Sequence, residues 1–181
     1  MIGIPGTVGG AIKMNAGAYG WEFSELLKDL RCFNLETFEI ETLKKEELEF
    51  SYRKSKNLDN KIILSATLIV EKGDQQIIDK NLSAFNEKRK KSQPAAIYNA
   101  GSVFKNTNEY YAGELIDNAG LKGYEIDGVS VSKKHANFFV AKKGAKAISL
   151  FELVQYVKDK VATKFGVILE EEIIFIGDFT K

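Results

Sequence analysis

The sequence predicts an α+β protein, in which helices and strands are mixed without a regular βαβ repeat. Two segments, 75–92 and 147–165, carry apolar residues at helical spacing. Several shorter segments rich in Val, Ile and Phe are typical of strands. Gln93-Pro94 ends the first helical segment, because the residue before a proline is driven out of the helical region. We therefore expect two domains, 1–92 and 93–181.

The first domain is expected to begin in a loop and to continue as a small sheet. Six glycines lie among the first twenty residues, and glycine permits positive φ and close approach to a ligand. The helix over 75–92 has an apolar stripe made by Ile77, Ile78, Leu82 and Phe85. The other expected elements are helical turns at 22–27 and 44–48 and strands at 30–35, 39–43 and 61–71.

The second domain is expected to combine two helices with short strands. Its long helix, 147–165, carries Leu150, Val154, Val157 and Val161 on one stripe. The remaining elements are a helix near 112–119 and strands at 102–105, 129–132, 137–141 and 172–176.

Composition excludes several classes of function. The net charge is +1, so no overall field favours nucleic acid or an acidic membrane. Apolar stretches such as 61–70 are far shorter than a membrane span. Cys32 is the only cysteine and His135 the only histidine, so we expect an inert buried thiol, no disulfide and no metal site. No signal peptide is visible, which makes the cytoplasm the expected compartment, and we expect a monomer.

Taken alone, each candidate motif leaves a structural alternative open. The run Gly3-Ile4-Pro5-Gly6-Thr7-Val8-Gly9-Gly10 could present backbone N–H groups to an anion or to a flat cofactor, or could be a structural turn. It is neither a Walker loop nor a Gly-x-Gly-x-x-Gly fingerprint. Arg53 offers a rigid fork of donors suited to a carboxylate or phosphate, but could be a surface arginine.

The remaining motifs lie in the second domain. Small residues before Ser102 would let a substrate approach its hydroxyl, although no Gly-x-Ser-x-Gly elbow is present. Glu170 and Glu172 share one face of the expected last strand and could equally be solvated charges. His135 more naturally makes a structural hydrogen bond than a metal bond, because no second ligand of the usual kind accompanies it.

The order of the motifs is more specific than any one of them. It runs as Gly3-Ile4-Pro5-Gly6-Thr7-Val8-Gly9-Gly10-Ala11, Met14-Asn15-Ala16-Gly17-Ala18-Tyr19-Gly20, Tyr52-Arg53-x-Ser55, Ala100-Gly101-Ser102-x-Phe104-Lys105-Asn106, Ala112-Gly113-x-Leu115-Ile116-Asp117, Ala119-Gly120-Leu121-Lys122-Gly123, Val131-Ser132-x-x-His135-Ala136-Asn137-Phe138, Phe165-Gly166-Val167 and Leu169-Glu170-x-Glu172. This series, covering nearly the whole chain, resembles UDP-N-acetylenolpyruvoylglucosamine reductase (UDP-N-acetylmuramate dehydrogenase).

The resemblance favours the type II form of that family, because the interval between Arg53 and Ser102 is too short for the extra segment of type I. Two positions depart from the family pattern: Thr107 and Glu171 stand where proline is common. Family members also carry roughly a hundred further residues, a domain-sized addition, before the Gly-Ile-Pro-Gly loop. We therefore expect residues 1–92 to be the C-terminal part of an FAD-binding domain, with Met1 an internal methionine of a longer flavoprotein. Residues 93–181 are then expected to be a small α+β substrate-binding domain.

The resemblance implies that NADPH reduces FAD, which then reduces the enolpyruvyl group of UDP-N-acetylglucosamine enolpyruvate. Arg53 would pair with the substrate carboxylate, Ser102 would donate a proton to C2, and Glu172 would assist as the second acid. Lys90, which stands among several lysines, and Asn106 would bind the UDP part. The flavin would contact Gly3, Ile4, Pro5, Gly6, Thr7, Val8, Gly9, Gly10, Asn15, Ala16, Gly17, Ala18 and Tyr19.

Two rival interpretations remain. A non-catalytic nucleotide-sugar-binding fragment would fold around the second domain and retain little or no FAD. An FAD oxidase with the same cofactor domain would need a different second domain, against which the Ser102 and Glu172 motifs argue.

Overall fold

The computed structural model describes residues 3–95 and 98–179. The chain divides into two compact units, Met1–Asn86 and Glu87–Lys181, with the division inside α2 (Gln75–Ser92). The mixed helix and sheet content confirms the predicted α+β class, whereas the domain boundary at 92/93 stays a prediction.

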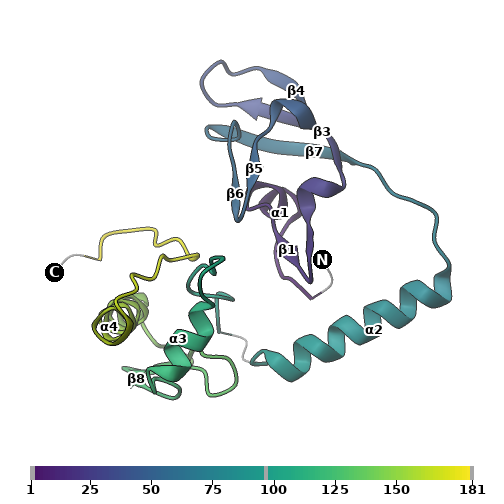
Figure 1. Ribbon diagram of the computed structural model, residues 1–181. Helices are drawn as coiled ribbons and strands as arrows, with labels where there is room; N and C mark the ends of the chain where they lie inside the picture. The colour runs from purple at the N-terminus through teal and green to yellow at the C-terminus, as the bar shows by residue number, and fades with distance from the viewer. Residues whose placement is uncertain (1–2, 96–97, 180–181) are drawn as a thin grey trace. The chain divides into compact units, whose positions relative to one another are not determined.

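The first unit is built on an antiparallel sheet with strand order β4-β3-β7 (Figure 1). Its small elements surround a core in which Ile12, Leu27 and Leu30 are fully buried. Cys32 belongs to this core, and burial raises the pKa of its thiol, as an inert cysteine requires. The elements of this unit, before α2, are α1 (Val8–Lys13), β1 (Gly17–Ala18), β2 (Trp21–Glu22), the 3-10 turn Phe23–Glu25, β3 (Leu27–Asn34), β4 (Ile40–Lys44), the 3-10 turn Lys45–Glu47, β5 (Phe50–Ser51), β6 (Lys54–Ser55) and β7 (Lys61–Leu68).

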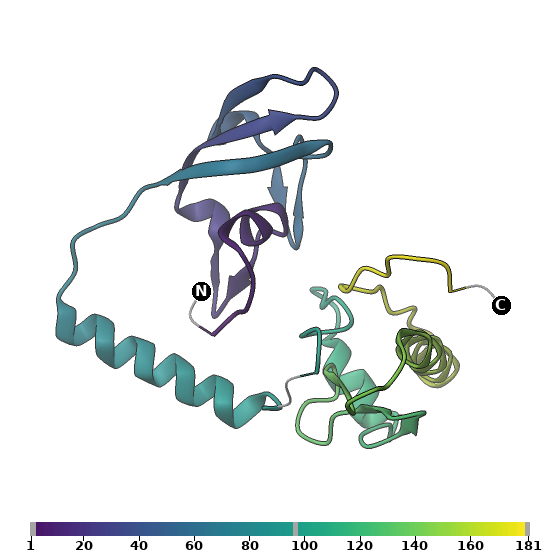
Figure 2. The same cartoon turned by 180° about the vertical axis from the view of Figure 1, so that it is seen from behind.

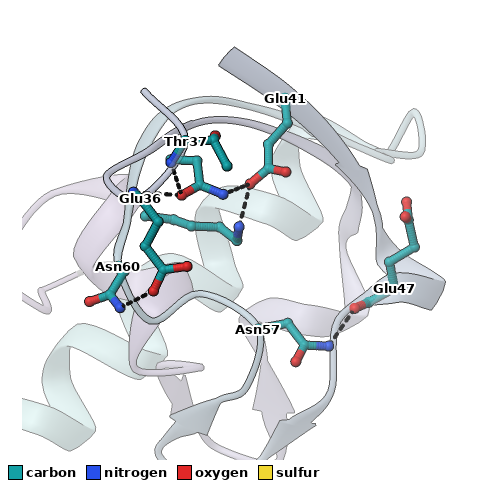
Figure 3. A network of polar contacts seen from close by, with 8 residues as sticks. Glu36, Thr37, Glu41, Glu47, Asn57 and Asn60 are labelled. Carbon is teal, nitrogen blue, oxygen red and sulfur yellow. Dashed lines mark hydrogen bonds and ion pairs between the residues drawn. The ribbon is translucent and has the colours of Figure 1, made fainter. Parts of the chain in front are cut away.

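A polar network closes the β3–β4 hairpin and fixes its register (Figure 3). The Asn34 side chain accepts hydrogen bonds from the backbone N–H groups of Glu36 (2.9 Å) and Thr37 (3.3 Å), forming an Asx turn. Asn60, just before β7, donates to the Glu36 carboxylate at 2.7 Å. Lys61 pairs with Glu41 of β4 across the sheet. Side chains from all three strands therefore stabilise one end of the sheet.

The second unit packs α4 (Ala147–Phe165) against α3 (Ala112–Asn118) and a three-stranded antiparallel sheet of order β10-β9-β8. The strands are β8 (Glu125–Ile126), β9 (Val129–Val131) and β10 (Phe139–Ala141). The predicted stripe of α4 is largely confirmed, because Val154, Val157 and Val161 are fully buried, as is Leu153 beside them. The helix ends at Gly166, whose φ of 69° is the left-handed conformation that glycine adopts most readily.

The predicted strand at residues 172–176 is wrong. All five residues are described, and none belongs to a named strand. Glu171, just before the segment, forms an isolated bridge with Phe104 instead. The segment then bends so that Phe175 packs against Phe151 of α4 and Phe179. A sustained ladder needs a partner of similar length, and the segment around Phe104 forms only isolated bridges, not the predicted strand at 102–105.

Candidate functional site

The glycine-rich start is half turn and half helix. Gly3 and Gly6 have positive φ values of 75° and 132°, as the loop interpretation predicts. From Val8 onward, however, the chain is α-helical, which corrects the prediction that the whole run is a loop. The cause is Thr7, whose hydroxyl accepts a hydrogen bond from the N–H of Gly10 at 3.0 Å and caps the helix. Two of the predicted flavin-contacting glycines, at positions 9 and 10, therefore lie in a helix.

Asn15 organises the segment that follows α1. Its side chain is fully buried, and its backbone has a φ of 39°, which is unusual for a residue other than glycine. The amide donates to the Glu22 carboxylate at 2.7 Å and to the Ser51 carbonyl at 3.2 Å, and accepts from the Ser24 N–H at 3.1 Å. One side chain thus joins the β1–β2 hairpin to β5, and it shapes the backbone of the 15–19 segment.

The structure places Arg53 against this same segment. Arg53 occupies the turn between β5 and β6 with a φ of 52°, which is a strained conformation for a long side chain. Its guanidinium lies 4.6 Å from the centre of the Tyr52 ring and donates to the Gly17 carbonyl at 3.2 Å. It is therefore not an isolated surface arginine. Within the first unit, the predicted carboxylate-binding residue and the predicted flavin-lining segment lie in direct contact.

In the second unit, Ser102 and Glu172 lie on two segments that are joined at Val103. Ser102 forms an isolated antiparallel bridge with Phe138 and follows Gly101, whose φ is 83°. The backbone N–H of Glu172 donates to the Val103 carbonyl at 2.7 Å. Figures 1 and 2 show the yellow C-terminal segment beside the loop that precedes α3. The structure therefore brings together two of the three predicted catalytic residues.

Ion pairs with lysines hold the acidic segment around Glu172. Glu170 pairs with Lys105, while Glu171 pairs with Lys158 of α4 at 2.8 Å. The side chains of Glu171 and Lys158 are each only 24% exposed, so this pair is screened less than a typical surface bridge. The two acids that precede Glu172 thus have structural partners in the fold.

The two residues predicted to bind the nucleotide have different surroundings. The Asn106 side chain accepts a hydrogen bond from the Ala112 N–H at 3.0 Å, at the start of α3. Lys90 is exposed near the end of α2, and its carbonyl accepts a hydrogen bond from the Lys134 ammonium. The sequence does not predict that Lys134 lies beside Lys90, because the two residues are 44 positions apart in the chain.

His135 makes the structural hydrogen bond that the sequence suggested. Its Nδ1 accepts from the Asn137 N–H at 3.2 Å, which requires that this nitrogen be unprotonated. Burial, with a smaller contribution from the nearby charge of Lys122, lowers the pKa of the imidazole. The described residues contain no group of three His, Cys, Asp or Glu side chains that could hold a metal ion.

Comparisons with known proteins relate the chain to one group of reductases. Residues 93–176 match the family described as the C-terminal domain of UDP-N-acetylenolpyruvoylglucosamine reductase. A protein named UDP-N-acetylenolpyruvoylglucosamine reductase from Caldanaerobacter subterraneus is 42% identical over 97% of this chain and 58% of its own length. One of the same name from Fervidobacterium nodosum is 44% identical over 94% of the chain and 56% of its length. Over nearly its whole length the chain is therefore similar to UDP-N-acetylenolpyruvoylglucosamine reductases, and its residues 93–176 match their C-terminal domain.

A solved structure supports the same conclusion for the fold. The crystal structure of UDP-N-acetylenolpyruvylglucosamine reductase from Thermus caldophilus matches with a TM-score of 0.83 and 34% identity. The match covers 94% of this chain and 60% of that protein. The chain thus spans somewhat more than half the length of the reductases it matches. No helix in the described part of the chain is both long and apolar enough to cross a membrane.

Proposed function

We propose that the chain takes part in the reduction of UDP-N-acetylglucosamine enolpyruvate to UDP-N-acetylmuramate, with FAD as cofactor and NADPH as hydride donor. The observation that carries the proposal is the junction at Val103, which holds Ser102 and Glu172 on neighbouring segments of a domain of this reductase family. The precursor belongs to peptidoglycan synthesis, so the proposal places the protein in cell-wall formation in the cytoplasm.

The glycine-rich segments of the first unit fit a flat cofactor. Gly6 and Gly20 have positive φ, and a Cβ atom added at either would meet no atom within 4 Å. These positions leave space against the backbone that a ring system could enter. We propose that residues 3–10 and 15–19 would line the isoalloxazine of FAD. When bound, the reduced flavin supplies hydride to C3 of the enolpyruvyl group.

The polar residues supply the remaining chemistry. Addition of hydride at C3 leaves negative charge at C2, conjugated with the substrate carboxylate. Arg53 can pair with that carboxylate through two parallel N–H donors and draw charge toward it. Ser102 donates a proton to C2, and Glu172 stabilises or protonates the enol form. General acid–base placement of this kind contributes about 10²–10⁴-fold to a rate.

The UDP part would be held by the cations and amides of the second unit. Lys90, with its neighbour Lys134, provides positive charge for the diphosphate, since lysine is a common phosphate ligand. Asn106 would contact the nucleotide at the start of α3. We expect the protein to act as a monomer on a soluble nucleotide sugar.

Substitution of Ser102 tests the proposal. Ser102→Ala should leave the reduction of flavin by NADPH unchanged and slow its reoxidation by the enolpyruvyl substrate by at least about 10²-fold. Ser130→Ala, which removes a hydroxyl from β9, is the matched control and should slow neither step. Equal slowing of both half-reactions by Ser102→Ala would show that the residue is structural.

A non-catalytic nucleotide-sugar-binding protein is the alternative, and a titration separates the two. The chain is mixed with excess FAD, and flavin fluorescence quenching and substrate-dependent NADPH oxidation are measured. Stoichiometric FAD with turnover supports the reductase. Binding of UDP-N-acetylglucosamine without FAD retention or turnover supports the alternative.

A further inference from the structure

The side chain of Asn137 makes two hydrogen bonds to one buried residue. Its Oδ1 accepts from the Phe104 N–H at 2.9 Å, and its Nδ2 donates to the Phe104 carbonyl at 2.8 Å. Asn137 is 1% exposed, and Phe104 is fully buried. The amide therefore pairs with Phe104 as a neighbouring strand would pair, at a place where water has no access to either group.

Main-chain bonds extend this contact to both predicted catalytic residues of the second unit. The Asn137 carbonyl accepts from the Val103 N–H at 2.8 Å, directly after Ser102. On its other side, Val103 accepts through its carbonyl from the N–H of Glu172 at 2.7 Å. The short segment that starts at Ser102 is thus held between Asn137 and the segment of Glu172.

The pattern of donors and acceptors makes an amide the suitable group at position 137. Phe104 presents one donor and one acceptor, and a primary amide offers the complementary pair. An ionised aspartate only accepts, so its second oxygen would face the Phe104 carbonyl. A leucine of similar size would leave both backbone groups of Phe104 without a partner.

We infer that Asn137 is a positioning residue, which sets the place of Ser102 through the adjoining Val103 and Phe104 and that of Glu172 through Val103. The inference rests on the proposed function, because it assigns Asn137 a role toward the enolpyruvyl group that those two residues would contact. In this role Asn137 acts through its hydrogen bonds to Phe104 and Val103 and touches no reacting atom.

The test compares two ligands, so that a general loss of stability does not imitate loss of positioning. With excess FAD present, calorimetry measures the dissociation constants of UDP-N-acetylglucosamine and of its enolpyruvyl ether. The dissociation constant of UDP-N-acetylglucosamine divided by that of the ether reports how much the enolpyruvyl group alone strengthens binding. Asn137→Leu and Asn137→Asp should lower this ratio about tenfold at neutral pH, the value of one hydrogen bond to a charged group. The exposed Asn108→Ala is the control and should leave the ratio unchanged.

A pH series adds a readout specific to the hydrogen-bond geometry. A protonated aspartic acid has one donor and one acceptor and can replace the amide, and burial raises the pKa of such a group. Lowering the pH from about 7.5 to about 5 should therefore restore the ratio in Asn137→Asp but not in Asn137→Leu. Each value is divided by that of the wild type at the same pH, which removes the titration of the groups on the surrounding segments: Lys105, Glu114, Asp117, Lys133, Lys134, His135, Glu170 and Glu172.

Each outcome decides between the inference and the function on which it rests. If the wild type does not prefer the enolpyruvyl ether, the proposed function fails and the inference fails with it. If the wild type prefers the ether and both Asn137 variants keep that preference, the inference alone is overturned. Loss in Asn137→Asp without recovery at low pH also overturns it. The aspartate variant keeps the test decisive should Asn137→Leu not fold.

Discussion

Replacing Gly9 by alanine should stabilise the first unit. Gly9 lies inside α1, and a Cβ added there would meet Ile63 of β7 at 3.6 Å, which is an ordinary van der Waals contact. Glycine inside a helix costs about 0.5–1 kcal/mol relative to alanine. We therefore expect Gly9→Ala to raise the free energy of unfolding by about that amount, or the melting midpoint by a few degrees.

Gly17→Ala is the matched variant with the opposite expectation. A Cβ at Gly17 would lie 2.8 Å from the Trp21 carbonyl oxygen, a backbone atom that cannot move without opening the β1–β2 hairpin. Overpacking of this kind costs about 1–3 kcal/mol. It would also displace Arg53, whose guanidinium bonds the Gly17 carbonyl.

Thermal melts followed by tryptophan fluorescence measure both variants. Trp21 is the only tryptophan and lies on β2, so the signal reports the first unit. A lower midpoint for Gly9→Ala would show that α1 lies closer to β7 than the 3.6 Å contact allows. An unchanged midpoint for Gly17→Ala would refute the hairpin contact. If glycine at position 9 also serves close approach of the flavin, Gly9→Ala should weaken FAD binding while it stabilises the protein.

Two further predictions concern the second unit. Burial lowers the pKa of His135, so the unfolded state binds more protons than the folded state at mildly acidic pH. The free energy of unfolding should therefore fall as the pH drops below about 6.5, by at most about 1.4 kcal/mol per pH unit. Urea titrations between about pH 5 and pH 7 measure this dependence on pH. His135→Gln should make the free energy of unfolding less dependent on pH. If the variant shows the same dependence as the wild type, other groups cause it. Leu153→Ala removes a fully buried side chain of α4 and should cost about 2–5 kcal/mol, whereas Ile174→Ala, at a side chain that is 73% exposed, should change stability by less than about 0.5 kcal/mol. Urea unfolding followed by circular dichroism compares the two, and similar losses would contradict the position assigned to α4 in the core.

The sequence predicts the long helices well because both their period and their ends are local signals. The observed α2 and α4 have the predicted limits, 75–92 and 147–165. Proline at position 94 and glycine at position 166 mark where each helix ends. The short helix α1 was missed because its glycines suggest a loop, while its cap depends on the single hydroxyl of Thr7.

The site could be predicted only as a set of residue types. Resemblance assigns roles to Arg53 and Ser102, but no local pattern shows that the guanidinium bonds the Gly17 carbonyl, 36 residues away. The same holds for Asn137, which the sequence presents as one residue of a motif and the structure shows in contact with Phe104, 33 residues away. Buried polar contacts between distant segments depend on tertiary packing, which periodicity and composition do not encode.

The apolar stripe of α2 shows that a helix can be predicted correctly from its sequence while the partner of its apolar face is not. All eighteen residues of α2 are described, and none is buried. Ile77 and Ile78 of the predicted stripe are 61% and 40% exposed, and Phe85 is 37% exposed although it stacks on Tyr19 at 4.8 Å. Helical period identifies the face that a helix tends to bury, but the partner must come from tertiary or quaternary contact. Because α2 has little packing of its own, we expect its amides to exchange with solvent sooner than those of α4, which hydrogen exchange measures directly. Equal protection of the two helices would show that the stripe is covered in solution.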